Sequence, residues 1–250
     1  MKLENKKIIV TGGASGMGAA AVKVFAREGA KVVTIDINEV NEKVDSVTYL
    51  QADVSNKDSI TNAINDAVGK LGGLDALFSI AGINHFIPTD ELTPEEITNL
   101  FAVNVNGVIF SCQAALPHLQ ANGGGSIVNF GSQAAINPGP DSSHYAASKA
   151  AVATFTSKIA WEWGKYNTRA NTVLPSAWTP LFEKLCCPGM EITPEIKAGI
   201  QANMKDTFPL GRLGDPEDDI APALVFLASD DSKYISGQAI GLNGGSAMVR

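Results

Sequence analysis

Short apolar runs rich in β-branched residues recur along the chain, separated by segments long enough to form helices. Most of these runs are continuously apolar rather than alternating between apolar and polar residues, which is typical of strands covered on both faces. The pattern predicts an α/β fold, a doubly wound parallel sheet with helices on both faces. Seven runs qualify as strands: Lys7 to Thr11, Lys31 to Ile37, Val47 to Ala52, Leu74 to Ile80, Ser126 to Phe130, Arg169 to Leu174 and Gln238 to Leu242.

The segments between these runs predict five helices. Pro94 and Pro216 suit the first turn of a helix, and each follows a residue able to cap it, Thr93 or Asp215. Gly29 suits a helix C-terminus. The predicted helices are Gly16 to Glu28, Lys57 to Leu71, Pro94 to Leu119, Tyr145 to Tyr166 and Pro216 to Ala228.

No repeat of fixed period and no linker-like tract interrupts the 250 residues, so we expect one domain over residues 1–250. One segment, Pro180 to Pro209, is poorly patterned because Pro188, Gly189 and Pro194 break it up. We expect this insertion, at about residues 180–209, to form a lid over a substrate site.

Charge and polarity exclude several classes of partner. The formal net charge is −7, and no stretch clusters lysine and arginine as a nucleic-acid-binding surface requires. Residues 97–140 carry no charged side chain, but Asn104, Asn106 and the glycine run 123–125 argue against a membrane span and for buried or subunit-covered protein. The opening MKLENKKIIV has no signal-peptide pattern, so we expect a cytoplasmic protein with neither a membrane nor a nucleic-acid partner.

Metal and disulfide sites are not expected. The cysteines form no C-x-x-C motif and are odd in number, which predicts reduced thiols at Cys112, Cys186 and Cys187. The histidines are too few and too scattered for a metal site. Two of them, His85 and His144, could face a pocket as polar contacts for a substrate.

The first predicted strand leads directly into a glycine-rich turn, Thr11 to Gly18, and then into a predicted helix. Such a turn lets a pyrophosphate approach the backbone and rest at the helix N-terminus, where free N–H groups favour an anion. The spacing of Gly12, Gly16 and Gly18 differs from G-x-G-x-x-G, but the strand, turn and helix context is the one that the motif requires. The turn therefore predicts a Rossmann-like, dinucleotide-binding domain.

Two acidic residues follow the next strands. Asp36 ends the second strand 18 residues after Gly18, close to the ~20 expected of a carboxylate that binds the adenosine ribose hydroxyls. A 2′-phosphate would face its negative charge, and the turn and Asn38 supply no lysine or arginine, so we expect NAD rather than NADP. Asp53, after the third strand, could receive the adenine amino group or cap the following helix, and the two roles are compatible.

Tyr145 and Lys149 stand four residues apart at the start of a predicted helix, so the hydroxyl and the ammonium share one face. An isolated pair of this kind is common. The pair Tyr145 and Lys149 is a candidate for catalysis because two further residues accompany it. Asn104 lies earlier in the chain, and Ser132 lies 13 residues before Tyr145, just past a predicted strand. A nearby ammonium favours phenolate and can bring a group of reference pKa ~10 toward working pH.

With these residues in place, the sequence resembles the short-chain dehydrogenase/reductase family over essentially its whole length. Three features occur in the family's order and spacing: T-G-x-x-x-G-x-G at Thr11 to Gly18, the set Asn104, Ser132, Tyr145 and Lys149, and the segment Pro175-x-x-x-Thr179.

The resemblance implies a role for each member of the catalytic set. Tyr145 exchanges a proton with the substrate oxygen, and Lys149 lowers the pKa of Tyr145 and holds the nicotinamide ribose. Ser132 hydrogen-bonds the reacting oxygen, and Asn104 supports a water relay to Lys149. Hydride passes directly between the substrate carbon and the nicotinamide. The resemblance also implies a homotetramer built partly from the helices at 94–119 and 145–166.

The expected binding sites follow from the same residues. The NAD site is expected to comprise Gly12, Ser15, Gly16, Met17, Gly18, Asp36, Ile37, Asp53, Val54, Ala81, Gly82, Tyr145, Lys149, Pro175, Trp178 and Thr179. The substrate site is expected to comprise His85, Ser132, Gln133, His144, Tyr145, Ser176 and Trp178. An apolar pocket with a few polar groups suits a small cyclic or aliphatic hydroxy compound better than a phosphorylated sugar or a carrier-bound acyl chain.

Two segments depart from the family pattern. The family's N-N-A-G is Ser79-Ile80-Ala81-Gly82 here, and we expect the missing asparagine to affect local stability rather than chemistry. The segment after Pro175 lacks the common glycine, although Thr179 could still bond the nicotinamide amide and Trp178 adds a large ring near the pocket. The pattern leaves open whether Arg250 reaches a neighbouring subunit's pocket.

Other chemistries fit less well. Ser132, His144 and Asp141 do not predict a hydrolase triad, because His144 and Asp141 are too close in sequence and no G-x-S-x-G elbow is present. Trp161 and Trp163 are expected to serve packing or subunit contact rather than ligand stacking.

We therefore expect an NAD-dependent oxidoreductase that interconverts a secondary alcohol and a ketone, with alcohol oxidation as the physiological direction. Reduction of a 3-oxoacyl or steroid-type ketone is the alternative within the family. A dinucleotide-binding subunit without catalysis is the alternative from another class, and the intact Ser132, Tyr145 and Lys149 argue against it.

Overall fold

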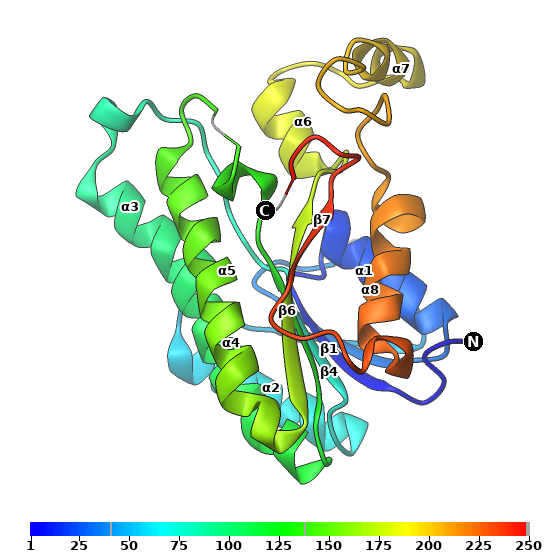
Figure 1. The fold of residues 1–250 in the computed structure, drawn as a ribbon. Coiled ribbons are helices and arrows are strands. Elements are labelled where there is room, and N and C mark those ends of the chain that lie inside the picture. Colours follow the sequence, from blue (N-terminus) through cyan, green and yellow to red (C-terminus); the bar gives the residue numbers. More distant parts are fainter. Residues whose placement is uncertain (41, 138, 249–250) are drawn as a thin grey trace.

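The computed structural model describes residues 1–40, 42–137 and 139–248. Its centre is a seven-stranded parallel sheet in the order β3-β2-β1-β4-β5-β6-β7 (Figure 1). The seven predicted strands are confirmed, with ends within two residues of those expected. The strands are β1 Lys7–Thr11, β2 Lys31–Asp36, β3 Val47–Gln51, β4 Ala76–Ser79, β5 Gly125–Phe130, β6 Thr168–Pro175 and β7 Ala239–Leu242.

The strand order reverses between β1 and β4, so a crevice opens beyond their carboxyl ends, where ligands bind in doubly wound sheets. Helices cover both faces of the sheet: α1 and α8 lie on one side, and α2, α4 and α5 on the other (Figure 1). The fold is therefore the expected Rossmann-like one. Its helices are α1 Gly16–Arg27, α2 Lys57–Leu71, α3 Pro94–Phe101, α4 Gly107–Ala121, α5 Ser143–Trp163, α6 Pro180–Cys186, α7 Pro194–Ala202 and α8 Ala221–Ala228.

A π-helical segment interrupts one of the long helices. The sequence predicts a single helix from Pro94 to Leu119, but Ala102–Asn106 is a π-helix that separates α3 from α4. The wider turn gives Asn104 a position that a regular helix would not, and such bulges are frequent at functional sites. The predicted helix Pro216 to Ala228 likewise begins as a π-helix, Pro216–Ile220, before α8.

The helical stretch Pro94–Ala121 is long and apolar enough, by length and composition alone, to cross a membrane, with a mean hydropathy of 1.4. In this fold its α4 part packs against α2 and the sheet. Cys112, Ala115 and Leu119 are fully buried there. A place in the core therefore accounts for part of the apolar composition of this helix, since 39% of its apolar window is buried.

The expected lid at residues 180–209 contains two helices, α6 and α7, which stand together above the carboxyl ends of the strands (Figure 1). The side chains of Thr179 and Thr193 cap them, accepting hydrogen bonds from Phe182 N and Ile196 N. A small cluster around Trp178, with Phe208 and Leu213, anchors the insertion to the body.

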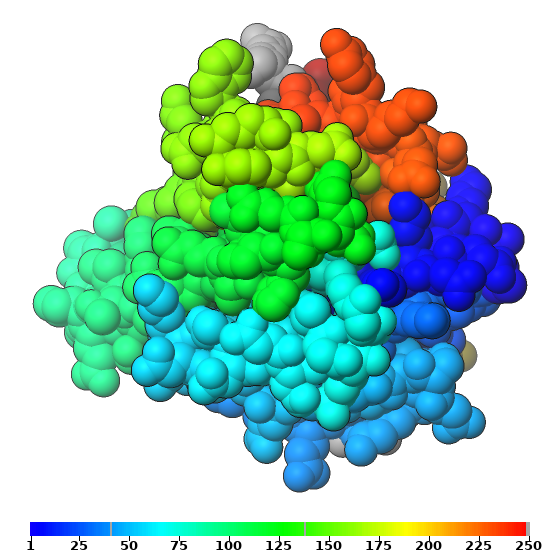
Figure 2. Space-filling model, turned by 90° about the horizontal axis from the view of Figure 1, so that it is seen from below, coloured from blue at the N-terminus to red at the C-terminus, as the bar shows by residue number. Residues whose placement is uncertain are grey.

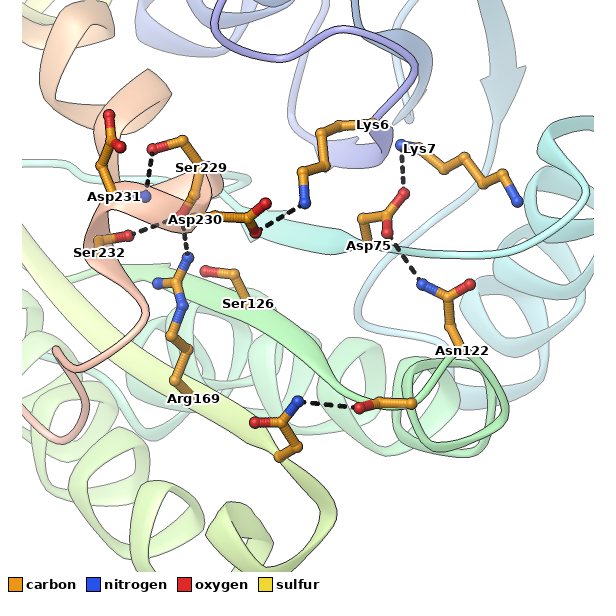
Figure 3. A network of polar contacts seen from close by, with 12 residues as sticks. Lys6, Lys7, Asp75, Asn122, Ser126, Arg169, Ser229, Asp230, Asp231 and Ser232 are labelled. Atoms are coloured by element: carbon orange, nitrogen blue, oxygen red, sulfur yellow. Dashed lines mark hydrogen bonds and ion pairs between the residues drawn. The ribbon is translucent and has the colours of Figure 1, made fainter.

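The opposite end of the sheet is closed by polar contacts between distant parts of the chain. Asp75 accepts hydrogen bonds from Lys7 N at 2.8 Å and from Asn122 Nδ2 at 2.9 Å (Figure 3). Lys6 pairs with Asp230 at 2.8 Å, and Arg169 Nη2 donates to the Ser229 carbonyl at 3.0 Å. Seen from below, segments from the beginning, middle and end of the chain meet on this face (Figure 2).

Candidate active site

A cleft of about 320 Å³ lies at the carboxyl ends of β1, β2 and β4. Two glycines allow the turn after β1 to fit there. A Cβ on Gly12, whose φ is +80°, would lie 2.5 Å from the backbone of Ala81, and a Cβ on Gly18 would overlap the Gly12 carbonyl oxygen. Ser15, at the N-cap of α1, makes no side-chain capping bond within the part of the chain that the structure describes. The first N–H groups of α1 therefore face the cleft as donors for a pyrophosphate.

Asp36 lies at the rim of this cleft, at the end of β2. Its Oδ2 accepts a hydrogen bond from Ala14 N at 2.9 Å, and its Oδ1 accepts one from Asn38 N at 2.9 Å. These bonds fix the carboxylate beside the glycine turn, and among the described residues no lysine or arginine lines the cleft. The cradle and the carboxylate fit an adenosine dinucleotide with free ribose hydroxyls.

Asp53 also lines the cleft, but it does not cap the helix that follows. Its Oδ1 accepts hydrogen bonds from Ser55 N at 2.8 Å and Ser55 Oγ at 2.7 Å, a local turn. Asn56 caps α2 instead, accepting from Ser59 N at 3.0 Å. The capping alternative for Asp53 is therefore wrong.

Most of the expected NAD-site residues come together in this one cleft. Four do not line it: Tyr145 and Lys149 stand on α5, Pro175 ends β6 inside the protein, and Trp178 is buried. The residues brought together are Gly12, Ser15, Gly16, Met17, Gly18, Asp36, Ile37, Asp53, Val54, Ala81, Gly82 and Thr179.

Sequence reasoning missed several other lining residues. Most are apolar residues at or just beyond strand ends, and the carboxyl ends of neighbouring strands meet at one edge of a parallel sheet. That rule could have found them. The missed residues are Ile35, Asn38, Ala52, Ile80, Ile83, Val103, Pro180 and Leu181.

Ser132 and Tyr145 meet just beyond the end of β5. Ser132 follows this strand, and its Oγ accepts a hydrogen bond from Ala134 N at 3.1 Å. Tyr145 lies in the first turn of α5. Burial raises the pKa of Tyr145 above its ordinary value, and hydrogen bonding with Ser132 opposes this rise. Ser132 thus favours the ionised form of the phenol.

Lys149 is almost fully buried one helical turn beyond Tyr145. Its Nζ donates to the Phe130 carbonyl at 2.9 Å and lies 5.7 Å from the centre of the Tyr145 ring. Burial lowers the pKa of Lys149 to about 8. The resemblance implies that Lys149 lowers the pKa of Tyr145, but in this structure the pKa of Tyr145 is raised by burial and is lowered only by the hydrogen bond with Ser132.

Asn104 reaches the same place from the π-helix, fully buried. Its Oδ1 accepts from Ile83 N at 2.8 Å, and its Nδ2 donates to Ile83 O at 2.9 Å and to Ser148 Oγ at 3.2 Å. A Cβ on Gly82 would lie 3.2 Å from Asn104 Oδ1 and 3.3 Å from Lys149 Nζ. Because Gly82 has no side chain, the Asn104 amide and the Lys149 ammonium can both lie close to it.

The expected substrate residues are arranged less uniformly. Gln133 Oε1 accepts a hydrogen bond from Ser246 Oγ of the C-terminal segment. Trp178 is buried, and its Nε1 donates to Glu183 Oε1 at 2.5 Å, so its ring belongs to the base of the insertion. Ser176 Oγ is buried with no partner among the described residues. Arg250 lies outside the residues that the structure describes.

His85 and His144 form a pair, with ring centres 5.0 Å apart and a 49° tilt between the rings. His144 is buried beside Tyr145 on α5, and His85 is part-buried on the segment after β4. Asp141, which the sequence already argued against as a triad partner, stands before α5 in a left-handed conformation, with φ at 54°.

Most of the other residues that the sequence singles out lie outside the cleft. Trp161 is 88% exposed on α5, whereas Trp163 packs partly buried against the core. Ile80, at the family's asparagine position, packs against the core around α1 and α8. At the centre of the sheet, Asn129 of β5 donates to Thr156 Oγ1 of α5 at 2.9 Å. The three cysteines are free.

Known proteins with similar sequences identify the family to which this fold and site belong. A family model described as enoyl-(acyl carrier protein) reductase matches residues 12–247. The 2,5-dichloro-2,5-cyclohexadiene-1,4-diol dehydrogenase LinX of Sphingobium indicum is 36% identical, with 98% of this chain and 97% of that protein covered. The 3-oxoacyl-(acyl-carrier-protein) reductase FabG of Thermotoga maritima is 37% identical, with 98% and 99% covered.

A solved structure agrees with these relatives. The 3-ketoacyl-(acyl-carrier-protein) reductase from Brucella melitensis, in complex with NADH, superposes with a TM-score of 0.87 at 31% identity, covering 98% of this chain and all of the other. Fold and site together define an oxidoreductase that uses a nicotinamide dinucleotide. The chain belongs to the short-chain dehydrogenase/reductase family.

Proposed function

We propose that the protein is an NAD-dependent dehydrogenase that oxidises a small cyclic or aliphatic secondary alcohol to a ketone, reversibly. One observation carries the proposal: Ser132, Tyr145, Lys149 and Asn104 converge from β5, α5 and the π-helix beside a cleft fitted to a dinucleotide. A noncatalytic dinucleotide-binding subunit would not need this set.

Each residue of this set has a separate role in the proposed reaction. The nicotinamide, when bound, accepts the hydride from the carbinol carbon. Tyr145 takes the hydroxyl proton, and Ser132 hydrogen-bonds both the phenol and the substrate oxygen. Lys149, held by the Phe130 carbonyl, supplies a positive charge near the phenol and binds the nicotinamide ribose.

The preference for NAD rests on Asp36. Its carboxylate is fixed by Ala14 N and Asn38 N at the cleft rim, where a 2′-phosphate would meet like charge. No basic residue stands among the described residues that line the cleft to offset it. These contacts support NAD as cofactor and, with it, oxidation as the working direction.

The substrate class rests on the polarity of the site. The side chains expected to contact the substrate are polar but carry no acidic or basic group beyond the histidines, and LinX, a dehydrogenase of a cyclic diol, is among the similar proteins. A second candidate activity is reduction of a 3-oxoacyl thioester. The similarity to FabG and to the reductase family model favours it.

Three further features belong to the same proposal. The helices at residues 180–209 act as a lid on a single domain. A homotetramer forms through α4 and α5, where exposed Trp161 offers an apolar contact that a subunit would cover. The enzyme works in the cytoplasm.

The test is NADH formation, followed by absorbance, with NADP in parallel. The panel comprises cyclohexanol, trans-cyclohexane-1,2-diol, 2-butanol, a polyol, a hydroxy acid and a hydroxysteroid. Reduction of an acetoacetyl thioester is measured separately, as consumption of NADH. We expect oxidation of a cyclic or linear alcohol with NAD. Faster thioester reduction would select the second activity, and NADH binding without turnover of any compound would contradict both. Light scattering tests the tetramer.

A further inference from the structure

A line of buried polar groups continues outward from the catalytic set. Asn104 Nδ2 donates to Ser148 Oγ at 3.2 Å, and Ser148 lies one helical turn from His144 on the same face of α5. Asn104 also holds both backbone polar groups of Ile83, and the chain runs from Ile83 through Asn84 to His85. Asn104 therefore bonds both elements that carry the histidine pair, α5 and the segment after β4.

The atoms at the end of this line have no protein partners. Both ring nitrogens of His144, Nε2 of His85 and Oδ1 of Asn84 are buried and make no hydrogen bond to the described residues. Buried polar atoms are almost always paired, with ordered water where protein is not the partner. The cluster thus has the composition of a short water-bridged path.

Two contacts fix this cluster against α5. Ile87 N donates to Asp141 O at 2.8 Å, and Thr89 Oγ1 donates to Ser143 Oγ at 2.8 Å. They hold the segment after β4 on the start of α5, close in sequence to His85 and His144. The pair is consequently built into the fold rather than left on a loose loop.

The surroundings suit transfer of a proton rather than storage of one. Burial and His85 lower the pKa of His144, and Glu96 on α3 opposes this shift. A neutral imidazole donates at one nitrogen and accepts at the other, so it can receive a proton and release another. The charged or titratable groups around the pair are Glu96 on α3 and Tyr145 and Lys149 on α5.

Every oxidation of a secondary alcohol by NAD yields a ketone, NADH and one proton, and that proton must reach solvent. We propose that His144 and His85 form the outer part of this proton path, beyond Asn104, so that part-exposed His85 exchanges the proton with solvent near Glu96. The inference rests on the proposed dehydrogenase activity. The same path runs inward when a ketone is reduced.

The test compares three histidine variants, because the chain has only three histidines. His144→Ala and His85→Gln remove the path. His118→Gln is the matched control, since His118 lies on α4 and contacts Asn65. The substrate is the panel alcohol that wild type oxidises fastest, at saturating NAD and low buffer concentration, in H₂O and D₂O and with deuterium at the carbinol carbon.

We expect kcat to fall about 10-fold in both path variants, with KM unchanged. The solvent isotope effect should rise and the carbon isotope effect should fall toward one, because proton transfer becomes the slow step. Millimolar imidazole should restore most of the activity of His144→Ala by filling the vacated space. His118→Gln should match wild type in every measurement.

A purely structural role predicts different results. His144→Gln keeps most of the side-chain volume, and melting temperatures identify any misfolded variant. Wild-type kcat in His144→Gln and His85→Gln would overturn the proton path while leaving the dehydrogenase intact, as would a loss that neither imidazole nor D₂O alters. If wild type oxidised no alcohol of the panel, both proposals would fall together.

Discussion

Asn104 closes a ring with the backbone of Ile83: its Oδ1 accepts from Ile83 N at 2.8 Å while its Nδ2 donates to Ile83 O at 2.9 Å. An amide side chain here replaces a strand partner for the segment that leaves β4. The π-helix at Ala102–Asn106 supplies the position from which Asn104 can do this. Asn104 therefore joins the π-helix to the segment after β4 and, through Ser148, to α5.

Replacing Asn104 by alanine should destabilise the protein. The substitution removes the hydrogen-bond partner of both backbone groups of Ile83 in a part-buried site, a loss of about 1–3 kcal/mol in the free energy of unfolding. Urea denaturation measures it. Asn122→Ala, which removes a single bond to Asp75 at the surface, should cost less; equal losses would contradict the role given to the ring.

Gly82→Ala should damage the site more than the fold. The new methyl group would stand 3.2 Å from Asn104 Oδ1 and 3.3 Å from Lys149 Nζ, so one of these groups must shift. We expect a clear drop in kcat, with a stability loss of about 1–3 kcal/mol. Gly69→Ala is the control: it lies in α2 with nothing within 4 Å, and alanine should stabilise that helix by about 1 kcal/mol.

Tyr145→Phe should abolish most turnover while leaving NADH binding nearly intact. Only the hydroxyl that exchanges a proton is lost, and such groups contribute about 10²- to 10⁴-fold to rate. Steady-state kinetics and NADH fluorescence titration measure the two properties separately. Tyr166→Phe, in the 3-10 turn just after α5, should behave like wild type. Undiminished turnover in Tyr145→Phe would refute the proton role.

Asp36→Ala should weaken NAD binding and relieve the exclusion of NADP. The carboxylate supplies the acceptors for ribose hydroxyls and the like charge that opposes a 2′-phosphate. The ratio of kcat/KM for the two cofactors reports the change, with Asp66→Ala as a control that removes a charge from exposed α2. A wild type that prefers NADP would contradict the assignment.

Stability should depend on pH through Lys149. Its pKa falls from 10.5 to about 8 in the folded protein, so between these values the unfolded chain binds more protons. The free energy of unfolding should therefore rise with pH across that window, by up to about 3 kcal/mol from this group. Urea titrations of wild type, Lys149→Met and the exposed control Lys158→Met should show the rise lost only in Lys149→Met.

Periodicity predicted the sheet because strand burial on both faces leaves a continuous apolar run, as in Ile8 to Val10. It could not predict the break at Ala102–Asn106, since a π-turn changes hydrogen-bond register without changing composition. The helices of the insertion did leave a signal. Each helix begins with a capping threonine followed by a proline, Thr179-Pro180 and Thr193-Pro194, as α3 does with Thr93-Pro94. The further prolines and glycines of the insertion obscured this helix-start pattern.

The cofactor cleft was predictable because glycines and Asp36 act through backbone position and strand ends. The substrate side was not, because its side chains depend on contacts between distant segments. Gln133 accepts a hydrogen bond from Ser246, which is more than a hundred residues away in the sequence. His144 contacts His85 only because the segment after β4 packs on α5. Likewise, the cap of α2 is Asn56 rather than Asp53, because a tight turn with Ser55 occupies the Asp53 carboxylate.

The contact between Gln133 and Ser246 has a practical consequence for handling the protein. Ser246 also receives Asn137 Nδ2 at its carbonyl, at 2.8 Å, so the end of the chain is part of the wall beside Ser132. Met1 is 76% exposed, and Lys6 and Lys7 lie at the opposite end of the strands (Figure 3). An affinity tag on the N-terminus is therefore far from the candidate active site. A tag on the C-terminus would follow closely after Ser246 and could displace the segment that packs beside Ser132.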